Sequence, residues 1–502
     1  MAAWEPAGPG PGPTGLAAAV RARSATGGRS HRWRRTCQAA ARERGPGSGP
    51  AYDLDPKAGL GVRAQAHRAP DQIQDQRNRS PADPDRASQL QQNGDSRGSF
   101  NAQSGGRLEL ATGLRGSWNA GTTSFRSRST AWRTALPIPW FGVDESLATA
   151  ELTDRLRQAI GEAGGVIPFA DFMRRALYEP GLGYYERASG IVGRDGDFYT
   201  NVSVGPLFGE LLAWQFATWL EALPPEAQFV EVGAHDGRLA SDILTWFQTH
   251  RSQEFDQLRY TIIEPSLVRR GWQQERLTEF AERVEWSASL APTCGIIFGN
   301  ELLDAFPVRP VQWHSSTGNW RELGVEWSNG RFVEIPFDRR PDTWAPELPA
   351  ELQAVFPDGF TTESSPEAEA WWAHAASQLE AGMLLAIDYG LTTEQFLMPQ
   401  RAQGTRRGYQ RHRPVTDLLA DPGAIDLTAQ VNLTRIQAAG EAAGLRTTGL
   451  HHQRVRLTEL FQKTLDPQAR FGEWTPARRR QFQTLTHPEH LGRGFQWLQQ
   501  MR

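Results

Sequence analysis

The stretch from residue 229 to residue 237 reads Phe229-Val230-Glu231-Val232-Gly233-Ala234-His235-Asp236-Gly237. Its first residues are apolar and partly β-branched, as in a strand that is buried on both faces of a sheet. Two glycines then break the strand, and Leu239, Ile243 and Trp246 follow at helical spacing. Strand, glycine turn and helix predict an open α/β sheet that holds a ligand at the carboxyl ends of its strands.

The glycine turn alone allows two interpretations. The full dinucleotide pattern G-x-G-x-x-G is absent, because Ala234 and Asp236 occupy intermediate positions. A tight turn between strand and helix, without any ligand, explains the two glycines about as well. The rest of the chain has to decide between them.

The composition limits the classes of protein. A chain of 502 residues has room for two or three domains, and its net charge of -3 gives no overall argument for nucleic-acid binding. No run of about 18 apolar residues occurs, so we expect no membrane-spanning helix. Cys37 and Cys294 are the only cysteines, which excludes a disulfide framework and a cysteine-rich zinc site, and we predict no metal.

The sequence changes character along its length. Residues 1–138 are rich in Gly, Pro, Ser and Arg and predict a disordered tail, with an organelle transit segment or a polyanion-binding arm as alternatives. Residues 139–225 predict a helical region, with helices near 148–163, 167–178 and 206–223. We expect a sheet-containing core over 226–455, interrupted by an insert at 308–382, and a helical extension over 456–502.

Further strands follow the glycine turn. Residues 259–263 predict a second strand that ends at Glu264, a carboxylate that can accept hydrogen bonds from ribose hydroxyls or simply face solvent. A third strand near 284–286 ends at Ser287, where an adenine would lie. A fourth strand, 295–299, ends in Asn300, Glu301 and Asp304, which are either ligand-binding groups or helix caps.

The remaining segments predict the parts of the chain that face a substrate. Residues 308–340 alternate aromatic and polar residues around two turns and predict β-hairpins. A fifth strand, 383–387, ends at Asp388, and the basic segment 401–416 either faces an acidic partner or is solvated. Asp426 is predicted to open a helix that carries Leu433. Thr200 lies in a loop ahead of a helix, and its spacing alone favours turn formation.

Several phrases occurring together resemble the MidA family of class I S-adenosylmethionine-dependent methyltransferases over residues 148–450. They are Leu177-Tyr178-Glu179-Pro180 with Gly183-Tyr184-Tyr185, Gly196-Asp197-Phe198-Tyr199-Thr200, Phe208-Gly209-Glu210, Glu231-Val232-Gly233, Asn300-Glu301-Leu302-Leu303-Asp304-Ala305-Phe306-Pro307, Asp388-Tyr389-Gly390 and Asp426-Leu427-Thr428-Ala429-Gln430-Val431-Asn432. The resemblance implies a Rossmann-like sheet with helices on both faces, an N-terminal helical region and an inserted β-hairpin subdomain. It also implies S-adenosyl-L-methionine as cofactor.

The resemblance further implies roles for individual residues. The cofactor would be bound by Thr200, Glu231, Gly233, Asp236, Gly237, Glu264 and Ser287, and the catalytic group would be Asn300, Glu301 and Asp304. The acceptor would be an arginine nitrogen of a protein, with a respiratory complex subunit as a candidate, since mitochondrial members of the family are linked to complex I assembly. Nucleic acid is not an expected partner.

Two other functions fit the same residues. The chain could be an assembly or scaffold protein that retains the cofactor-binding fold without turnover, or a nucleotide-dependent oxidoreductase. The missing third glycine and the inserted hairpins count against the second. The few cysteines favour a cytoplasmic location, with the mitochondrial matrix as the alternative.

Overall fold

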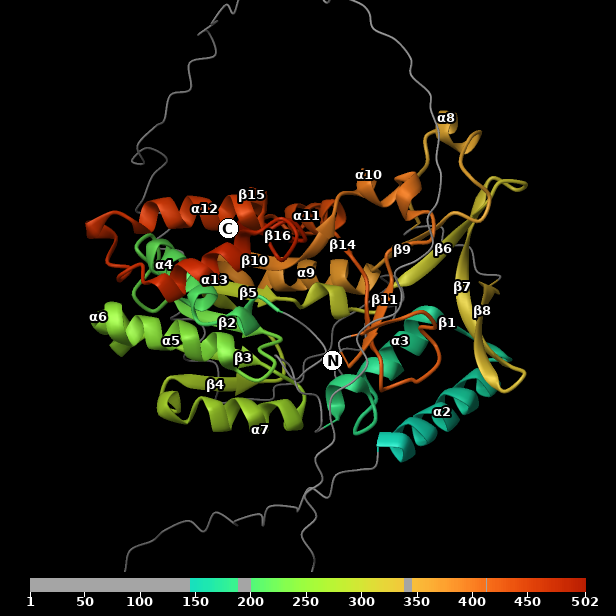
Figure 1. Cartoon of the computed structure of the whole chain (residues 1–502), viewed down its shortest axis with the longest axis horizontal. Helices are drawn as coiled ribbons and strands as arrows, with labels where there is room; N and C mark the ends of the chain where they lie inside the picture. The colour runs from blue at the N-terminus through green and yellow to red at the C-terminus, as the bar shows by residue number, and fades with distance from the viewer. Residues whose placement is uncertain (1–144, 188–199, 338–344, 412) are drawn as a thin grey trace, which may run out of the picture. The chain divides into compact units, whose positions relative to one another are not determined.

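The computed structural model describes residues 145–187, 200–337, 345–411 and 413–502 (Figure 1). The predicted disordered tail, residues 1–138, lies outside these ranges, as do residues 196–199 of the loop before Thr200. All described residues belong to one compact unit.

Helices and strands alternate along most of the described chain. The α-helices are α2 (Glu145–Glu162), α3 (Phe169–Tyr178), α4 (Leu207–Leu220), α5 (Arg238–His250), α6 (Ser252–Gln257), α7 (Leu267–Arg276), α8 (Ala350–Gln353), α9 (Pro366–Gln378), α10 (Thr393–Phe396), α11 (Leu433–Ala442), α12 (Gln453–Thr464) and α13 (Pro476–Thr486). The strands are β1 (Val166–Pro168), β2 (Gln228–Val232), β3 (Tyr260–Ile263), β4 (Val284–Ser287), β5 (Thr293–Asn300), β6 (Arg309–His314), β7 (Asn319–Ser328), β8 (Arg331–Phe337), β9 (Thr361–Ser364), β10 (Leu379–Leu391), β11 (Arg407–Gln410), β12 (Arg413–Val415), β13 (Asp426–Thr428), β14 (Val431–Asn432), β15 (Arg446–His452) and β16 (Phe495–Met501).

The central sheet has the strand order β15-β16-β10-β5-β2-β3-β4, with β14 added beside β10. Strands β4, β3, β2, β5 and β10 are parallel neighbours, and β16 is antiparallel to both β10 and β15. The chain runs outward from β2 through β3 to β4 and then returns to β5 on the other side of β2. This reversal places a ligand site at the carboxyl ends of β2 and β5.

Helices cover both faces of this sheet, as Figure 1 shows and as the sequence predicts. Along β2, Phe229 belongs to the apolar cluster that includes α4 and α5, whereas Val230 belongs to the cluster that includes α9 and α11. The same alternation separates Ile296 from Ile297 in β5. Because successive residues of a strand face opposite sides, the continuous apolar runs of β2 and β5 require a helical layer on each side.

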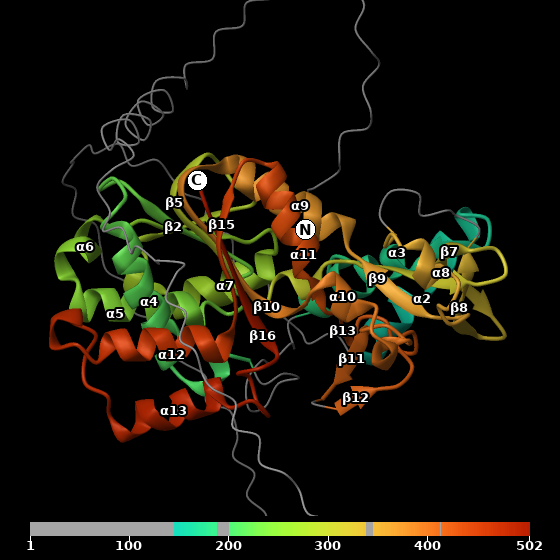
Figure 2. The ribbon, with the colours of Figure 1, turned by 90° about the horizontal axis from the view of Figure 1, so that it is seen from above.

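A second sheet forms the insert, with the order β1-β7-β6-β9 and with β8 beside β7. Figure 2 shows this sheet to the right of the central sheet, beside α2 and α3. The β7–β8 turn contains Asn329 and Gly330, both with positive φ, as a two-residue hairpin requires. The predicted helix over 167–178 begins only at Phe169, because residues Val166–Pro168 pair with β7 as β1.

Two predictions for the C-terminal third are wrong in part. The extension over 456–502 contains α12 and α13, but Phe495–Met501 forms β16 inside the central sheet. The glutamines of this last segment are typical of a solvent-exposed helix, which is why the sequence predicts one. Gln500 is nevertheless fully buried, where it accepts a hydrogen bond from Trp372 Nε1 at 2.7 Å and donates to Gln437 O at 2.9 Å. Asp426 opens strand β13 and not a helix, since α11 begins at Leu433.

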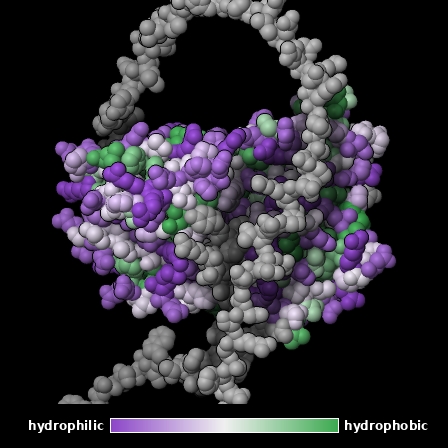
Figure 3. Space-filling model, viewed as in Figure 1, coloured by the Kyte–Doolittle hydropathy of each residue, from purple (hydrophilic) through white to green (hydrophobic). Residues whose placement is uncertain are grey.

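The face of the molecule in Figure 3 is mainly hydrophilic among the coloured residues, with apolar residues in scattered small groups. Within the described ranges, no helix combines the length and apolar character needed to cross a membrane.

Candidate active site

One cavity lies at the carboxyl ends of β2 and β5. It is lined by Tyr184, Tyr185, Thr200, Val202, Ser203, Glu231, Gly233, Ala234, His235, Asp236, Arg238, Leu239, Asn300, Glu301, Asp304, Tyr389, Asp426 and Thr428. Seven of the ten predicted site residues are among them. The other three, Gly237, Glu264 and Ser287, do not line it.

The strand register places the predicted residues at one edge of the sheet. Glu231 in β2 is level with Ile262 in β3 and with Phe298 in β5. Because all three strands are parallel, Glu264 and Asn300 end at the same edge, two residues further on. The proposed cofactor and acceptor groups are therefore at the same end of the sheet.

The glycine turn has the backbone conformation that its sequence predicts. Gly233 has φ 75° and Gly237, which precedes α5, has φ 81°. A Cβ atom on Gly233 would lie 3.0 Å from Leu302 Cδ1. Asp236 accepts hydrogen bonds from Arg238 N at 3.1 Å and from Arg276 Nη2 at 2.8 Å. These contacts fix the turn at the start of α5.

The titratable groups near the turn have strongly shifted pKa values. Glu231 is buried and accepts a hydrogen bond from Tyr260 Oη at 2.6 Å, and burial raises its pKa to about 7. The pKa of Asp236 is lowered, despite its burial, by His235 and Arg276. Burial lowers the pKa of His235 to about 4, so its imidazole is neutral at pH 7.

Glu264 and Ser287 lie at the ends of β3 and β4, at the same edge of the sheet as the cavity. Glu264 Oε1 accepts from Ser266 N at 2.9 Å and Oε2 accepts from Gln273 Nε2 at 3.1 Å. A carboxylate has further lone pairs for two hydroxyl donors. Ser287 Oγ donates to Ser289 O at 2.8 Å.

Thr200 has local contacts of the kind that its spacing predicts. Its Oγ1 accepts a hydrogen bond from Ser203 N at 3.1 Å, as in a turn, although Thr200 also lines the cavity.

Glu301 projects from the end of β5 in a strained conformation, with φ 54°. Its backbone N donates to Ile387 O at 2.9 Å, and its Oε1 accepts from Asn300 Nδ2 at 3.0 Å and from Asn201 N at 3.3 Å. Burial, together with the nearby charge of Asp304, raises the pKa of Glu301 to about 8. A non-glycine residue held at positive φ at a strand end is typical of functional sites.

Asp304 is a second carboxylate in the same loop, and like Glu301 it is half-buried. Its Oδ2 accepts from Thr428 Oγ1 at 2.9 Å, and burial raises its pKa to about 6. Two carboxylates that are partly removed from water and close together favour a bound cation, because a cation compensates for the cost of their partial burial.

Asp388 was not among the predicted site residues, although it fixes the loop that carries them. It is 1% exposed, and its Oδ2 accepts from Leu302 N at 3.0 Å and from Leu303 N at 2.7 Å. Burial raises its pKa well above the usual range. It lies inside β10, but in the sequence it directly follows the apolar run 383–387, and that position was the signal that could have identified it.

Tyr184, Tyr185 and Asp426 also line the cavity without having been predicted as site residues. Tyr185 Oη donates to Asp426 Oδ1 at 2.9 Å, across 241 residues of sequence. The rings of Tyr184 and Tyr185 meet edge to face at 5.2 Å. The segments around Tyr185 and around Asp426 both belong to phrases that resemble the MidA family. This resemblance was the only signal for these residues in the sequence.

The lining fits S-adenosylmethionine. The glycine turn leaves backbone next to the cavity, and the N-terminus of α5 with Arg238 offers positive charge for a carboxylate. Glu231, Asp236 and Glu301 offer negative charge for an ammonium or a sulfonium group. A zwitterionic ligand with an additional positive centre matches this distribution of charge.

Comparisons with known proteins also support S-adenosylmethionine as the cofactor. Residues 211–451 match the model of the family described as "Putative S-adenosyl-L-methionine-dependent methyltransferase". A crystal structure from Burkholderia thailandensis, with S-adenosyl-homocysteine bound, is 31% identical to this chain, with a TM-score of 0.61, over 73% of this chain and 95% of that one.

Two curated relatives have names that are more specific. The mitochondrial protein arginine methyltransferase NDUFAF7 homolog of Drosophila melanogaster is 26% identical over 66% of this chain and 81% of its own length. The mitochondrial protein arginine methyltransferase NDUFAF7 of Homo sapiens is 26% identical over 67% of this chain and 83% of its own length. With the fold, the cavity and these matches together, the chain belongs to the S-adenosyl-L-methionine-dependent methyltransferases that its resemblance to the MidA family predicts.

Proposed function

We propose that this protein methylates a side-chain nitrogen of arginine in a protein acceptor. The observation that carries the proposal is the pair of half-buried carboxylates, Glu301 and Asp304, that share one cavity with the Gly233 turn. The names of the curated relatives support the choice of arginine.

The carboxylates have a chemical task in such a reaction. A guanidinium has a pKa above about 12 and its charge is delocalised, so its nitrogens are poor nucleophiles. Paired hydrogen bonds to Glu301 and Asp304 orient the group and draw its positive charge away from the attacking nitrogen. Holding that nitrogen about 3 Å from the electrophilic methyl group that S-adenosylmethionine supplies accounts for much of the rate.

The same carboxylates can take the proton that the nitrogen loses. Glu301, whose pKa is about 8 in the free protein, is a stronger base than an ordinary carboxylate. A bound guanidinium keeps it ionised until the methyl group is transferred. Asn300 donates to Glu301 Oε1 and thereby holds the acid in place.

The cofactor side is assigned on the same basis. Gly233 would let the backbone approach the methionine part, Gly237 would end the turn ahead of α5, and Glu231 and Asp236 would offer acceptors to the ammonium group. Glu264 would bind the ribose hydroxyls and Ser287 would border the adenine, since they lie at the ends of the next two strands. Thr200 closes the cavity from the loop before α4.

We extend the proposal to the compartment and to the acceptor protein. Both curated relatives are named as mitochondrial, which favours the mitochondrial matrix over the cytoplasmic location that the few cysteines suggest. A subunit of a respiratory complex is then our candidate for the acceptor.

A labelling experiment tests the proposal. Purified protein is incubated with methyl-radiolabelled S-adenosylmethionine and a lysate, and the labelled residues are identified by mass spectrometry. We expect label on arginine in protein, and none when Glu301→Gln replaces the wild type. Label on another residue type, or on small molecules only, would contradict the assignment. Cofactor binding without any turnover would instead favour the scaffold alternative.

A further inference from the structure

The basic segment 401–416 contains arginines of two kinds. It has no Asp or Glu, and most of it forms the β11–β12 hairpin. Arg406 has a side chain that is only 10% exposed, whereas that of Arg411 is 86% exposed, and Arg407 and Arg413 are exposed as well. The buried arginine and the exposed ones therefore need separate explanations.

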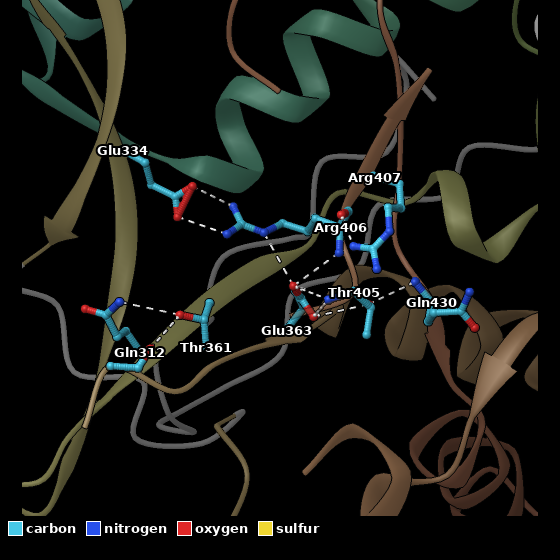
Figure 4. Close-up of polar contacts among 9 residues, drawn as sticks. Gln312, Glu334, Thr361, Glu363, Thr405, Arg406, Arg407 and Gln430 are labelled. Atoms are coloured by element: carbon cyan, nitrogen blue, oxygen red, sulfur yellow. Dashed lines mark hydrogen bonds and ion pairs between the residues drawn. The ribbon is translucent and has the colours of Figure 1, made fainter. Parts of the chain in front are cut away.

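Arg406 anchors the base of the hairpin, as Figure 4 shows. Its guanidinium donates two hydrogen bonds to Glu334, at 2.8 and 3.0 Å, and its Nε lies 3.4 Å from Glu363 Oε1. Glu363 is buried and accepts from Thr405 N at 2.9 Å, and Thr405 Oγ1 accepts from Gln430 N at 3.1 Å. These bonds tie the hairpin to the insert and to the segment after β13.

The hairpin is one strand away from the acceptor side of the cavity. In the three-stranded sheet β12-β11-β13, Tyr409 pairs with Asp426, which lines the cavity. Neighbouring strands are about 4.8 Å apart, and Arg411 lies in the turn after β11, two residues beyond Tyr409 and therefore at most about 7 Å from it. An extended peptide whose arginine enters the cavity would meet the exposed guanidinium groups with residues about two to four positions away, at about 3.3 Å per residue.

Among the described residues, one ion pair is found for the exposed arginines of the hairpin, that of Arg411. Arg411 Nη2 is 3.7 Å from Glu145 Oε2, and both side chains are largely exposed, so this ion pair contributes little. Arg407 Nη1 donates to a backbone carbonyl, that of Arg406. The positive charge of the hairpin is thus available to a partner.

We propose that the β11–β12 hairpin is a docking surface for an acidic segment of the acceptor protein that flanks the methylated arginine. The inference rests on the proposed function, because it takes the cavity as the arginine site. It goes further by giving the acceptor sequence a charge pattern: one arginine with Asp or Glu about two to four residues away. Complementary charge of this kind mainly speeds association and selects the partner.

Three fluorescein-labelled peptides test the inference with the full chain. Each has one central arginine, and the positions two to four residues away carry Asp, Asn or Lys. Binding is measured by anisotropy with S-adenosylhomocysteine present, and methylation is measured with radiolabelled cofactor. We expect the Asp peptide to bind about tenfold more tightly than the Asn peptide at low salt, and the difference to vanish at about 0.5 M salt.

A pair of charge-matched variants locates the effect. The double variant Arg411→Glu/Arg413→Glu should lose the preference for the Asp peptide and prefer the Lys peptide. The control, Arg331→Glu/Arg480→Glu, makes the same change of charge at two exposed arginines outside the hairpin and should keep the preference. Both variants should bind S-adenosylhomocysteine as the wild type does, which shows that they are folded.

The possible outcomes separate the two proposals. Equal binding of the three peptides, or an equal loss in the control variant, would overturn the docking surface. So would displacement of the Asp peptide by a single-stranded RNA that binds more tightly, since the hairpin would then be a nucleic-acid surface. If arginine is not methylated in any peptide or in the lysate, the proposed function itself fails, whatever the binding preference.

Discussion

The two sides of the cavity are built in different ways. The part of the proposed cofactor side that would hold the methionine portion comes from one continuous stretch, β2, the glycine turn and the start of α5, within residues 228–250. The acceptor side brings together Tyr185, Glu301, Asp388 and Thr428 from four segments that are far apart in the chain. On this proposal one side depends on backbone conformation, and the other depends on carboxylates that tertiary contacts hold in place. Substitutions should divide accordingly between cofactor affinity and turnover.

The largest effect should follow from Glu301→Gln. The substitution keeps the shape of the side chain but removes the negative charge and the base, so we expect kcat to fall about 100-fold or more. The dissociation constant of S-adenosylmethionine, measured by calorimetry, should change little. Glu285→Gln, at an exposed position in β4, is the control and should retain full activity. An active Glu301→Gln enzyme would contradict the division between the two sides, because turnover would not depend on this carboxylate.

Asp388→Asn should have the next largest effect. The neutral amide weakens the hydrogen bonds from Leu302 N and Leu303 N, so the loop that carries Glu301 shifts. We expect kcat to fall roughly tenfold to 100-fold, since small displacements of positioned groups are costly in rate. Steady-state kinetics measure this. Asp358→Asn removes a carboxylate that accepts from a backbone N–H at an exposed site, and it should leave kcat unchanged.

Gly233→Ala should affect the other side of the cavity. The residue has φ 75°, and its new Cβ would approach Leu302 Cδ1. The left-handed conformation costs an alanine about 1–2 kcal/mol, so we expect the affinity for S-adenosylmethionine to fall about tenfold if the turn relaxes out of the cavity. Gly318→Ala has a similar φ of 63° and open space around it, and it serves as the control. A change in kcat alone, with unchanged affinity, would contradict the division between the two sides.

The smallest effect should be the dependence on pH. Glu301 acts as a carboxylate, so activity is lost as pH falls through its pKa of about 8 in the free enzyme. We expect kcat/KM for the acceptor to rise about fivefold from pH 7 to pH 8. A bound guanidinium favours the ionised acid, so the rise in kcat should occur at lower pH. A profile of kcat/KM that is flat over this interval would argue against Glu301 as the titrating group.

The contrast between the two sides also explains what the sequence could predict. Strand, turn and helix around Gly233 are contiguous, so periodicity and glycine spacing identified them. Asp304 and Thr428 are 124 residues apart, and no local pattern indicates that they share a hydrogen bond. Asp426 was placed in a helix because the periodicity of α11 was extended too far back. The family resemblance, and not spacing, brought these segments together.

The position of β16 has a consequence during synthesis. This strand lies between β10 and β15, and the chain that forms both neighbours leaves the ribosome more than 40 residues earlier. Until residues 495–501 emerge, β10 and β15 each present an unpaired edge, which in other nascent chains attracts aggregation and chaperones. A chain that lacks residues 495–502 should therefore remain bound to Hsp70-type chaperones, whereas the full chain should be released from them.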